Sequence, residues 1–411
     1  MEVRVMNKIS LLMILFLLVL QSCKGSDKKN IQDAAVSLTV WHYFAEQDVD
    51  VFNEGIQKYA RQKDIEVTST FVERRDLLKQ YTMGALSGRL PDVGLVDNPD
   101  HASFAVMGIF QDITDLVEAT GEKDFFFKGP LLSATYEGKL YGLPHNSNAL
   151  ALFINNAMFR EKNLEAPTTW DELLVVCEKL ADKEKGVYPL AMSAVNTEEG
   201  TFQFMPWLLS AGGGIEDLGG ENSIRAVKFL KTLIDKGYMS IDVINWGQGS
   251  ANTQFMNGLA AMQVNGPWNI PTIQQEAPDL DFSVVLLPKD QKYASVLGGE
   301  NFAVLSGAPR EEAFDLLYFI TSKEVVADYA ARAGKFPSRS DALELKTIWT
   351  EDPLLKVFGE ELKFALPRGP HPRWPEISSI IIGAVTEVLT GVKTAEESMQ
   401  EAAAKYDEII R

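Results

Sequence analysis

The chain has 411 residues, 46% of them hydrophobic, with 57 acidic and 39 basic side chains and a formal net charge of −18. A chain of this length and apolar content can bury more than one hydrophobic core, which predicts about two domains. The acidic balance argues against a nucleic-acid-binding protein, because that affinity depends on Lys and Arg side chains that neutralise phosphates.

The first 22 residues are typical of a secretory signal peptide. Arg4 and Lys8 give a basic start, and residues 9–20 form an apolar run interrupted only by Ser10. Such a run at helical rise spans about 18 Å, which is too short for a bilayer core of about 30 Å. A buried N-terminal helix is the alternative, but no amphipathic pattern marks a face for it. We therefore interpret residues 1–22 as a leader that export removes.

Residues 20–23, Leu-Gln-Ser-Cys, resemble the lipobox of bacterial lipoproteins, in which the cysteine becomes the lipidated first residue. Gln21 departs from the usual pattern. Cys23 is thus the predicted lipidation site, and residues 23–35 are predicted to be the lipidated cysteine and a flexible polar tether. The other cysteine, Cys177, lies at helical spacing from two leucines, which indicates a buried core thiol and no intramolecular disulfide.

Strand and helix patterns alternate in the first part of the mature chain. We expect strands at 37–43, 65–72 and 92–96, with helices around 52–59 and 74–86 between them. This order predicts an α/β fold with a parallel sheet and right-handed crossovers.

The second half of the chain has mainly helical patterns, with one β-rich island. Strands are expected there at 260–264, 282–287 and 301–305, and the island can complete the first sheet if the chain crosses between lobes more than once. Three capping boxes are predicted, formed by Thr169 with Glu172, Thr321 with Glu324, and Thr394 with Glu397.

The sequence carries no recognised catalytic motif. It has no Gly-x-Ser-x-Gly, no His-Glu-x-x-His, no phosphate-binding Gly-x-x-x-x-Gly-Lys and no Cys-x-x-Cys. The four histidines, at 42, 101, 145 and 371, do not cluster at ligand spacing, so no metal and no cofactor is predicted. A pair of glycosidase carboxylates needs no sequence motif, so an enzyme stays open as an alternative.

Several segments in order resemble the bacterial extracellular solute-binding proteins of family 1, the group that includes maltose-binding protein. The resemblance covers about residues 37–411. The matching segments are Leu-Thr-Val-Trp at 38–41, Ser-Gly-Arg-Leu-Pro-Asp-Val at 87–93, Glu-Gly-Lys-Leu-Tyr-Gly-Leu-Pro at 137–144, Pro-Thr-Thr-Trp-Asp-Glu-Leu at 167–173, Phe-Met-Asn-Gly-Leu-Ala-Ala-Met at 255–262 and Asn-Gly-Pro-Trp at 265–268.

The resemblance implies a two-lobe, periplasmic-binding-protein-like fold of type II, with hinge crossings and ligand held in the inter-lobe cleft. The N-terminal lobe would comprise residues 36–145 plus 264–306, and the C-terminal lobe residues 146–263 plus 307–411. Closure of the lobes on a ligand is a known hinge motion.

The function implied is that of a monomeric, extracytoplasmic, non-enzymatic protein. It would capture a carbohydrate reversibly and deliver it to an ABC permease, and it would touch the membrane only through the N-terminal lipid. Alternatives are the same fold binding a polyol, a glycerol phosphate or an anionic sugar, and a secreted glycan-processing enzyme or glycan sensor.

Sugar sites combine aromatic rings, which pack on C–H faces, with planar polar groups that pair with hydroxyls. Trp268 follows the turn residues Gly266-Pro267 and matches the family position that stacks on sugar; a packed core tryptophan is the alternative. Trp207 and Gln203 fall in a region that faces the cleft in related proteins, and they fit a core equally well.

Polar candidates follow the expected strands of the first sheet, at the edge where such sheets bind ligands. Tyr43 and Glu46 come after the first strand, and Asp97 and Asn98 come after the third, where capping of a helix is the alternative. Asn148 follows the first crossing, where relatives place a ligand-contacting polar residue; a turn asparagine is its alternative.

Two loops complete the predicted site. Gly299 and Glu300 precede an expected strand, and glycine there lets backbone approach a ligand closely, although a plain hairpin loop fits as well. Arg373 lies in the proline-rich segment 367–375 and can pair with a hydroxyl or a carboxylate, unless it is a solvated surface arginine.

Overall fold

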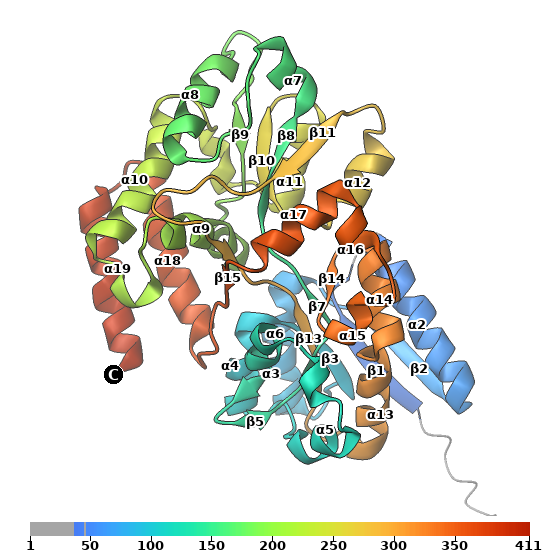
Figure 1. Cartoon of the computed structure of the whole chain (residues 1–411). Helices are drawn as coiled ribbons and strands as arrows, with labels where there is room; N and C mark the ends of the chain where they lie inside the picture. The colour runs from blue at the N-terminus through green and yellow to red at the C-terminus, as the bar shows by residue number, and fades with distance from the viewer. Residues whose placement is uncertain (1–36, 45–46) are drawn as a thin grey trace, which may run out of the picture.

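The computed structural model describes residues 37–44 and 47–411, which form two lobes stacked end to end (Figure 1). Each lobe is built on its own β-sheet with helices packed against it. The predicted signal peptide, the lipidation site Cys23 and the candidate Glu46 lie outside the described residues.

The first lobe contains a five-stranded sheet in the order β2-β1-β3-β13-β6. Its strands are β1 (Ser37–His42), β2 (Glu66–Phe71), β3 (Val93–Asp97), β6 (Leu143–Pro144) and β13 (Glu300–Val304). Strand β1 pairs in parallel with β2 and β3, whereas β13 pairs antiparallel with β3 and with β6. The predicted parallel β-α-β-α-β start is therefore confirmed.

The burial of these strands follows their sequence pattern. In β1 the residues alternate, so that Leu38 and Val40 are buried and Ser37 and Thr39 are exposed. All five residues of β3 are buried, as expected for a central strand with both faces covered. Helices α2 (Gln47–Lys63), α3 (Leu77–Ser87), α4 (His101–Val106), α5 (Thr114–Thr120), α6 (Lys128–Ser133), α13 (Arg310–Ile320) and α14 (Lys323–Arg332) surround this sheet, and a small hairpin is formed by β4 (Thr135–Tyr136) and β5 (Lys139–Leu140).

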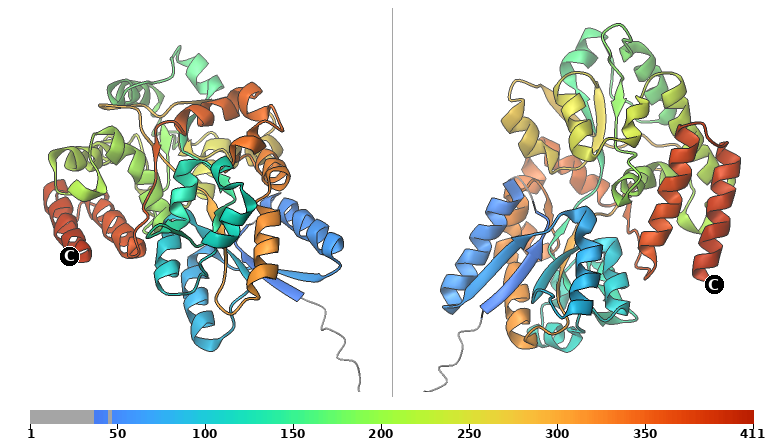
Figure 2. Two further views of the ribbon diagram at one scale, coloured as in Figure 1. Left: turned by 60° about the horizontal axis from the view of Figure 1, so that its bottom comes forward. Right: turned by 180° about the vertical axis from the view of Figure 1, so that it is seen from behind.

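The second lobe contains a four-stranded sheet in the order β11-β8-β10-β9. Its strands are β8 (Ala151–Asn155), β9 (Leu190–Ala191), β10 (Met262–Asn265) and β11 (Phe282–Val285). Its helices are α7 (Asn156–Glu161), α8 (Trp170–Leu180), α9 (Glu198–Ser210), α10 (Glu221–Asp235), α11 (Gln248–Met256), α12 (Asn269–Glu276), α15 (Ser340–Leu343), α16 (Ile348–Glu351), α17 (Pro353–Glu361), α18 (Trp374–Leu389) and α19 (Ala395–Ile410). Figure 2 shows α18 and α19 side by side along α9 and α10.

Two parts of the expected division between the lobes differ in the structure. Strands β10 and β11 do not return to the first sheet, because both pair antiparallel with the buried strand β8; only β13 returns. Helix α13 belongs with the first lobe, where Ala313 packs in the same core as Val93. Helix α14 lies between the lobes, with Tyr329 in that core and Val326 in the core beside β8. The segments 264–306 and 307–411 are therefore each shared between the lobes.

Three crossings connect the lobes. The first passes from β6 to β8 through β7 (Asn146–Ser147), the second from β11 to β13 through β12 (Ser295–Val296), and the third from α14 to α17 through β14 (Phe336–Pro337). Strand β7 pairs with β14, and β12 pairs with β15 (Ala365–Leu366), which precedes α18. The crossings thus lie between the two sheets as short paired strands. A hinge motion between the lobes would have to bend the chain at these connections.

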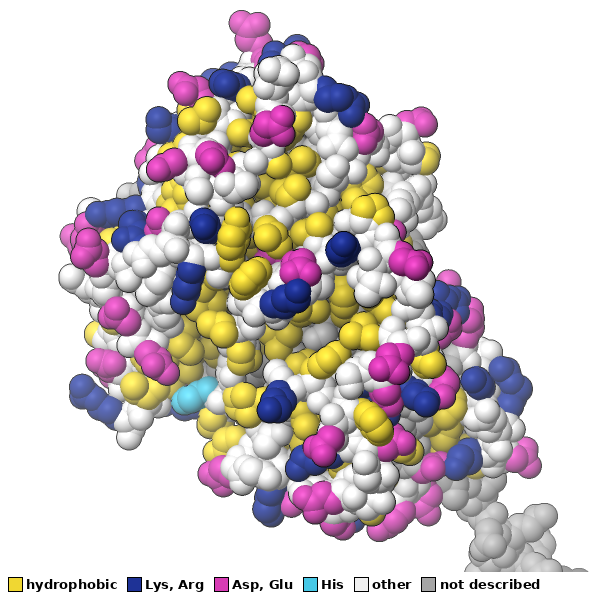
Figure 3. Space-filling view, viewed as in Figure 1, with side chains coloured by type: hydrophobic (Ala, Val, Ile, Leu, Met, Phe, Trp, Pro, Cys, Tyr) yellow, Lys and Arg dark blue, Asp and Glu magenta, His cyan; other side chains and the backbone are white. Residues whose placement is uncertain are grey.

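The outer surface is mixed in character. Acidic and basic side chains are spread over both lobes in Figure 3, and hydrophobic side chains gather across the middle, over the crossings. Within residues 37–44 and 47–411, no helix has the length and apolar character that a membrane span requires.

Candidate functional site

A cavity of about 320 Å³ lies between the lobes, beside the three crossings. The first lobe contributes Tyr43, Phe44, Asp48, Arg74, Asp97 and Glu300; the second contributes Glu199, Phe202, Gln248, Gly249, Trp268, Asn269 and Thr272; the crossings and the segment before α18 contribute Asn148, Gly298, Gly299, Ala333, Lys335 and Arg368. A ligand here would touch both lobes at once.

Trp268 presents a half-buried indole to this cavity. The ring folds back over the turn before α12, so closely that a Cβ atom on Gly266 would lie 2.0 Å from two of its carbon atoms. Phe202 on α9 is its aromatic neighbour, with ring centroids 6.4 Å apart and planes inclined by 34°. The turn and α9 together fix the position of the indole.

Five polar atoms around the cavity are buried and have no hydrogen-bond partner among the described residues. They are Tyr43 Oη, Asn148 Oδ1, Gln248 Nε2, Asn269 Nδ2 and Glu300 Oε2, of which the last has no hydrogen bond but lies at ion-pair distance from Lys335. Buried polar groups are normally paired, so a set of unpaired ones around one cavity marks a place where a ligand can supply the partners. The set contains donors, acceptors and a hydroxyl that is both, which matches the hydrogen-bonding range of a polyhydroxylated molecule.

Lys335 anchors one side of the cavity. Its Nζ lies 2.7 Å from Asp48 Oδ2 and 3.8 Å from Glu300 Oε2, and it donates to Tyr329 Oη at 3.0 Å. Burial acts to lower the pKa of Lys335, but the two carboxylates outweigh it and raise the pKa above its usual value. The ammonium is therefore charged and already neutralised by protein groups.

Asp97, at the end of β3, forms ion pairs with two arginines. Arg74 Nη2 lies 2.5 Å from Asp97 Oδ2, and Arg368 Nη2 lies 3.2 Å from Asp97 Oδ1. Burial acts to raise the pKa of Asp97, but Arg368 and Arg74 overcome it and hold the pKa below its usual range. Both carboxylate oxygens are thus engaged by guanidinium groups.

Arg368 connects the lobes. Its guanidinium pairs with Asp97 in the first lobe and with Glu198 at the start of α9 in the second, and it stacks over the ring of Phe202 at 4.5 Å. Trp374 Nε1 donates to the other oxygen of Glu198 at 2.9 Å. The two terminal nitrogens of this nearly fully buried guanidinium are thus held by carboxylates, whereas its Nε has no hydrogen-bond partner among the described residues.

The structure brings together part of the predicted site. Tyr43, Asp97, Asn148, Trp268, Gly299 and Glu300 all line the cavity. Gly299 adopts φ +133°, and a Cβ there would lie 2.3 Å from the carbonyl oxygen of Asn146, so close backbone packing requires glycine at this position. That any of these residues binds a ligand stays a prediction.

Four predicted residues lie elsewhere. Trp207 packs in the second lobe against Trp170 and Phe229, and Gln203 is fully buried within α9. Asn98 is buried and lines a separate, much smaller cavity beside Arg368, and Arg373 points outward and pairs with Glu376 one turn along α18. The cavity does not reach these four side chains.

The predicted site contains neither Lys335 nor Phe202, and from the proline-rich loop it contains Arg373 but not Arg368. Arg368 lies five residues before Arg373 in the same proline-rich loop, so the loop was found and the wrong arginine was chosen. Phe202 immediately precedes Gln203 in α9. The two side chains lie on different faces of the helix, and only that of Phe202 lines the cavity. For Lys335 no sequence signal was present.

Two lobes joined by three crossings, with a polar and aromatic cavity at the junction, define the class of two-lobe solute-binding proteins. The model of the bacterial extracellular solute-binding proteins matches residues 54–357, which is most of the chain. The chain therefore belongs to this family, whose members bind solutes outside the cytoplasm.

Curated relatives span most of this chain. It is 25% identical over 394 residues to the maltotriose-binding protein of Pyrococcus abyssi, covering 91% of this chain and 81% of the relative. It is 24% identical over 348 residues to the multiple sugar-binding protein of Streptococcus mutans, covering 79% and 80%. Both relatives are named as binding proteins.

Solved structures share the fold. An ABC transporter solute-binding protein from Thermotoga lettingae, bound with α-D-tagatose, superposes with a TM-score of 0.85 at 27% identity and covers 91% of this chain and 100% of that one. A maltose-bound protein from T. maritima gives a TM-score of 0.82 at 24% identity, covering 91% and 99%. The likeness thus spans both lobes.

Proposed function

We propose that this chain is the extracytoplasmic binding component of an ABC importer and that it captures an uncharged carbohydrate reversibly between its lobes. The observation that carries the proposal is the cavity itself, in which the Trp268 indole faces a set of unpaired hydrogen-bonding atoms. The relatives support it: two are named as binding proteins for maltotriose and for multiple sugars, and one solved structure holds α-D-tagatose.

The charges of the cavity favour a neutral ligand over an anionic one. Among the described residues that line the cavity, the cations are Arg74, Lys335 and Arg368, and each lies within ion-pair distance of a carboxylate of the protein. An anionic sugar or a glycerol phosphate would have to compete for these cations and leave buried carboxylates unpaired, which costs free energy. The hydroxyls of a neutral sugar need only the unpaired polar atoms.

Capture requires no covalent chemistry. A sugar that touches both lobes lowers the free energy of the closed arrangement and shifts the population toward it. The closed form would then be recognised by a membrane permease. We further propose that the mature chain is monomeric and that the lipid on Cys23 holds it at the cell membrane; the family relationship supports the location outside the cytoplasm.

A panel of mono-, di- and oligosaccharides, polyols and sugar phosphates tests this function by thermal shift and calorimetry. A ligand at about 100 times its Kd adds about 2.7 kcal/mol to the free energy of unfolding. For wild type we expect neutral sugars to raise Tm by a few degrees.

The variant Trp268→Ala should lose at least about 2 kcal/mol of binding free energy, roughly 30-fold in Kd, because it removes the central aromatic contact. Tyr293→Ala is the matched control, since Tyr293 is a half-buried aromatic residue that stacks on Phe364 away from the cavity. Response to charged ligands alone would move the assignment to anionic sugars, and conversion of a saccharide into products would contradict simple capture.

A further inference from the structure

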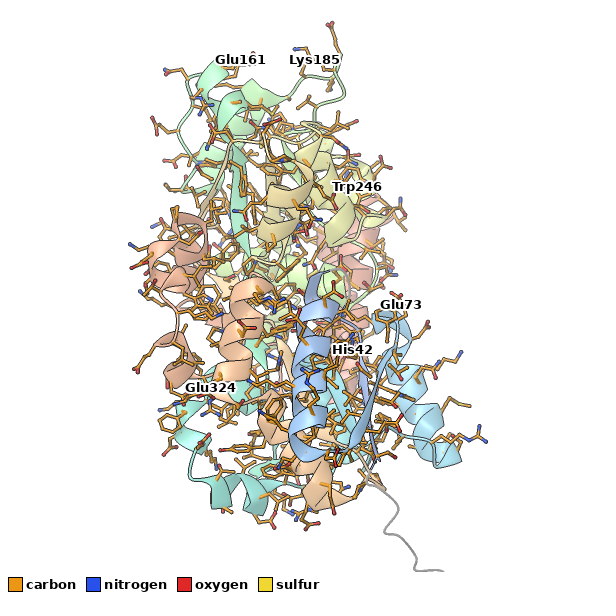
Figure 4. The ribbon with its side chains drawn as sticks, turned by 90° about the vertical axis from the view of Figure 1, so that its right-hand side faces the viewer. His42, Glu73, Glu161, Lys185, Trp246 and Glu324 are labelled. Carbon is orange, nitrogen blue, oxygen red and sulfur yellow. The ribbon has the colours of Figure 1, made fainter. Side chains whose placement is uncertain are left out.

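A second cavity lies between the lobes, beside the first. It has a volume of about 480 Å³ and is lined on the first lobe by Glu73, Leu78 and Asp100, and on the second by Val195, Thr197 and Ile382 among others. Figure 4 shows Glu73 at the edge of the lower lobe, where it faces the upper lobe. Arg74, Asp97 and Glu199 line both cavities, so these three side chains lie at the boundary between them, and we call them the partition.

Contacts from both lobes hold the partition in place. On the first lobe, Arg74 pairs with Asp97 at 2.5 Å, and Asp97 is also held by Arg368 at 3.2 Å. On the second lobe, Glu199 Oε1 accepts a hydrogen bond from the backbone N–H of Gln248 at the start of α11. Charge-assisted bonds of this kind are stronger than neutral ones and fix the geometry of their partners.

The two cavities differ in what they offer a sugar. The first has the rings of Tyr43, Phe44, Phe202 and Trp268. None of the described residues that line the second is aromatic; they include aliphatic side chains and the carboxylates of Glu73, Asp97, Asp100, Glu198 and Glu199. A saccharide would therefore gain stacking contacts on one side of the partition only.

We propose that Arg74, Asp97 and Glu199 act as a wall that sets the length of the carbohydrate, restricting the site to short saccharides of one or two rings. The inference rests on the proposed function of the same cavity. The cavity on the aromatic side, at about 320 Å³, lies at the lower end of the range of about 300–1,000 Å³ for small-molecule sites. A longer chain would have to displace an ion-paired arginine to continue into the second cavity.

The test compares affinities for a disaccharide and a tetrasaccharide of one homologous series. Calorimetry on the mature protein would use the malto-, cello- and β-1,4-galacto-oligosaccharides, and the ratio of the two Kd values is the readout. For wild type we expect the disaccharide to bind at least about tenfold more tightly than the tetrasaccharide.

Removing the wall should reduce this ratio. In Arg74→Ala the two cavities join, and we expect the ratio to fall to within about threefold. Glu199→Ala opens the same wall from the other lobe. If both variants lower the ratio, the change cannot be attributed to a folding defect of one variant. Because the readout is a ratio, a general loss of affinity in a variant cancels.

Arg373→Ala is the control, because Arg373 is a similarly exposed, ion-paired arginine that lines neither cavity. Its ratio should equal that of wild type. Equal affinity of wild type for the two lengths, or an unchanged ratio in both wall variants, would overturn the wall while leaving carbohydrate capture intact. Failure of wild type to bind any saccharide would overturn the wall together with the proposed function.

Discussion

Gly266 controls the position of the Trp268 indole, because the ring folds directly over its Cα. A Cβ at this position would lie 2.0 Å from two ring carbons, far inside van der Waals contact. The position of this Cβ is fixed by the backbone, so the Cβ cannot move away from the ring. The indole must therefore leave its place if residue 266 gains a side chain.

Gly266→Ala should weaken carbohydrate binding by at least about tenfold, because it displaces the aromatic platform without removing it. Calorimetry with the best ligand of the panel measures the effect. Gly383→Ala is the control, since a Cβ on Gly383, within α18, would meet no atom within 4 Å. Equal affinities of Gly266→Ala and wild type would show that the ring position is not needed for binding.

At the residue scale, the segments that reach the cavity are easier to predict from the sequence than the individual side chains that line it. Tyr43, Asp97 and Glu300 were found because each flanks a strand of the first sheet on the side of the cavity. The ion pair of Arg368 with Asp97 joins residues 271 positions apart, and no local pattern reports such a partner. The choice of Arg373 over Arg368 failed for this reason.

At the scale of elements, helix starts show how far local signals extend. The predicted capping box of Thr394 and Glu397 is confirmed in full at α19. Thr169 caps α8 as expected, but the carboxylate of Glu172 bonds to Thr168 instead of closing the box. The prediction that Thr321 caps α14 is wrong. Ser322 stands at the cap position, and the hydroxyl of Thr321 donates back to the carbonyl of Leu317 at the end of α13.

Sheet membership is less accessible from sequence than strand position. The strands near 262, 282 and 301 exist as predicted, yet β10 and β11 pair with β8 and only β13 joins the first sheet. All three are short segments of four or five residues that mix apolar and polar side chains. Their partners are selected by three-dimensional packing, which a local pattern does not contain.

The start of α17 gives a quantitative test at this scale. Asp352 accepts hydrogen bonds from the backbone N–H groups of Leu354 and Leu355 at 2.8 and 3.0 Å, with Pro353 in the first helical position. Asp352→Ala should lower the free energy of unfolding by about 1 kcal/mol, because it leaves these groups without their cap. Urea unfolding measures the change.

Asp352→Asn is the matched control for this cap, because the amide oxygen can accept the same bonds. We expect it to stay within a few tenths of a kcal/mol of wild type. A loss of the same size in both variants would indicate that charge near the helix start matters more than the hydrogen bonds.

At the scale of the whole molecule, contacts join segments that lie far apart in the sequence. Glu361, the last residue of α17, is 1% exposed, and its Oε1 accepts a hydrogen bond from the backbone N–H of Leu287 at 2.6 Å. Leu287 lies just after β11, where the second crossing begins. A buried carboxyl therefore ties the end of the third crossing to the start of the second.

This carboxyl makes stability depend on pH. Burial raises the pKa of Glu361 to about 8 in the folded state, against an ordinary value of 4.5, and the hydrogen bond from Leu287 only partly opposes the shift. Between these values the folded state holds a proton that the unfolded state has released. The contribution of Glu361 to the free energy of unfolding therefore falls as pH rises from about 4.5 to about 8.

Glu361→Gln should remove this dependence, because glutamine keeps an acceptor for Leu287 and cannot ionise. Urea unfolding at several pH values in this window should show the variant gaining on wild type by at most about 1.4 kcal/mol per pH unit. Glu360→Gln, which alters the exposed neighbouring residue paired with Lys363, should instead run parallel to wild type. Parallel profiles for Glu361→Gln and wild type would mean that Glu361 is ionised throughout the window, and that the junction between the crossings tolerates a buried charge.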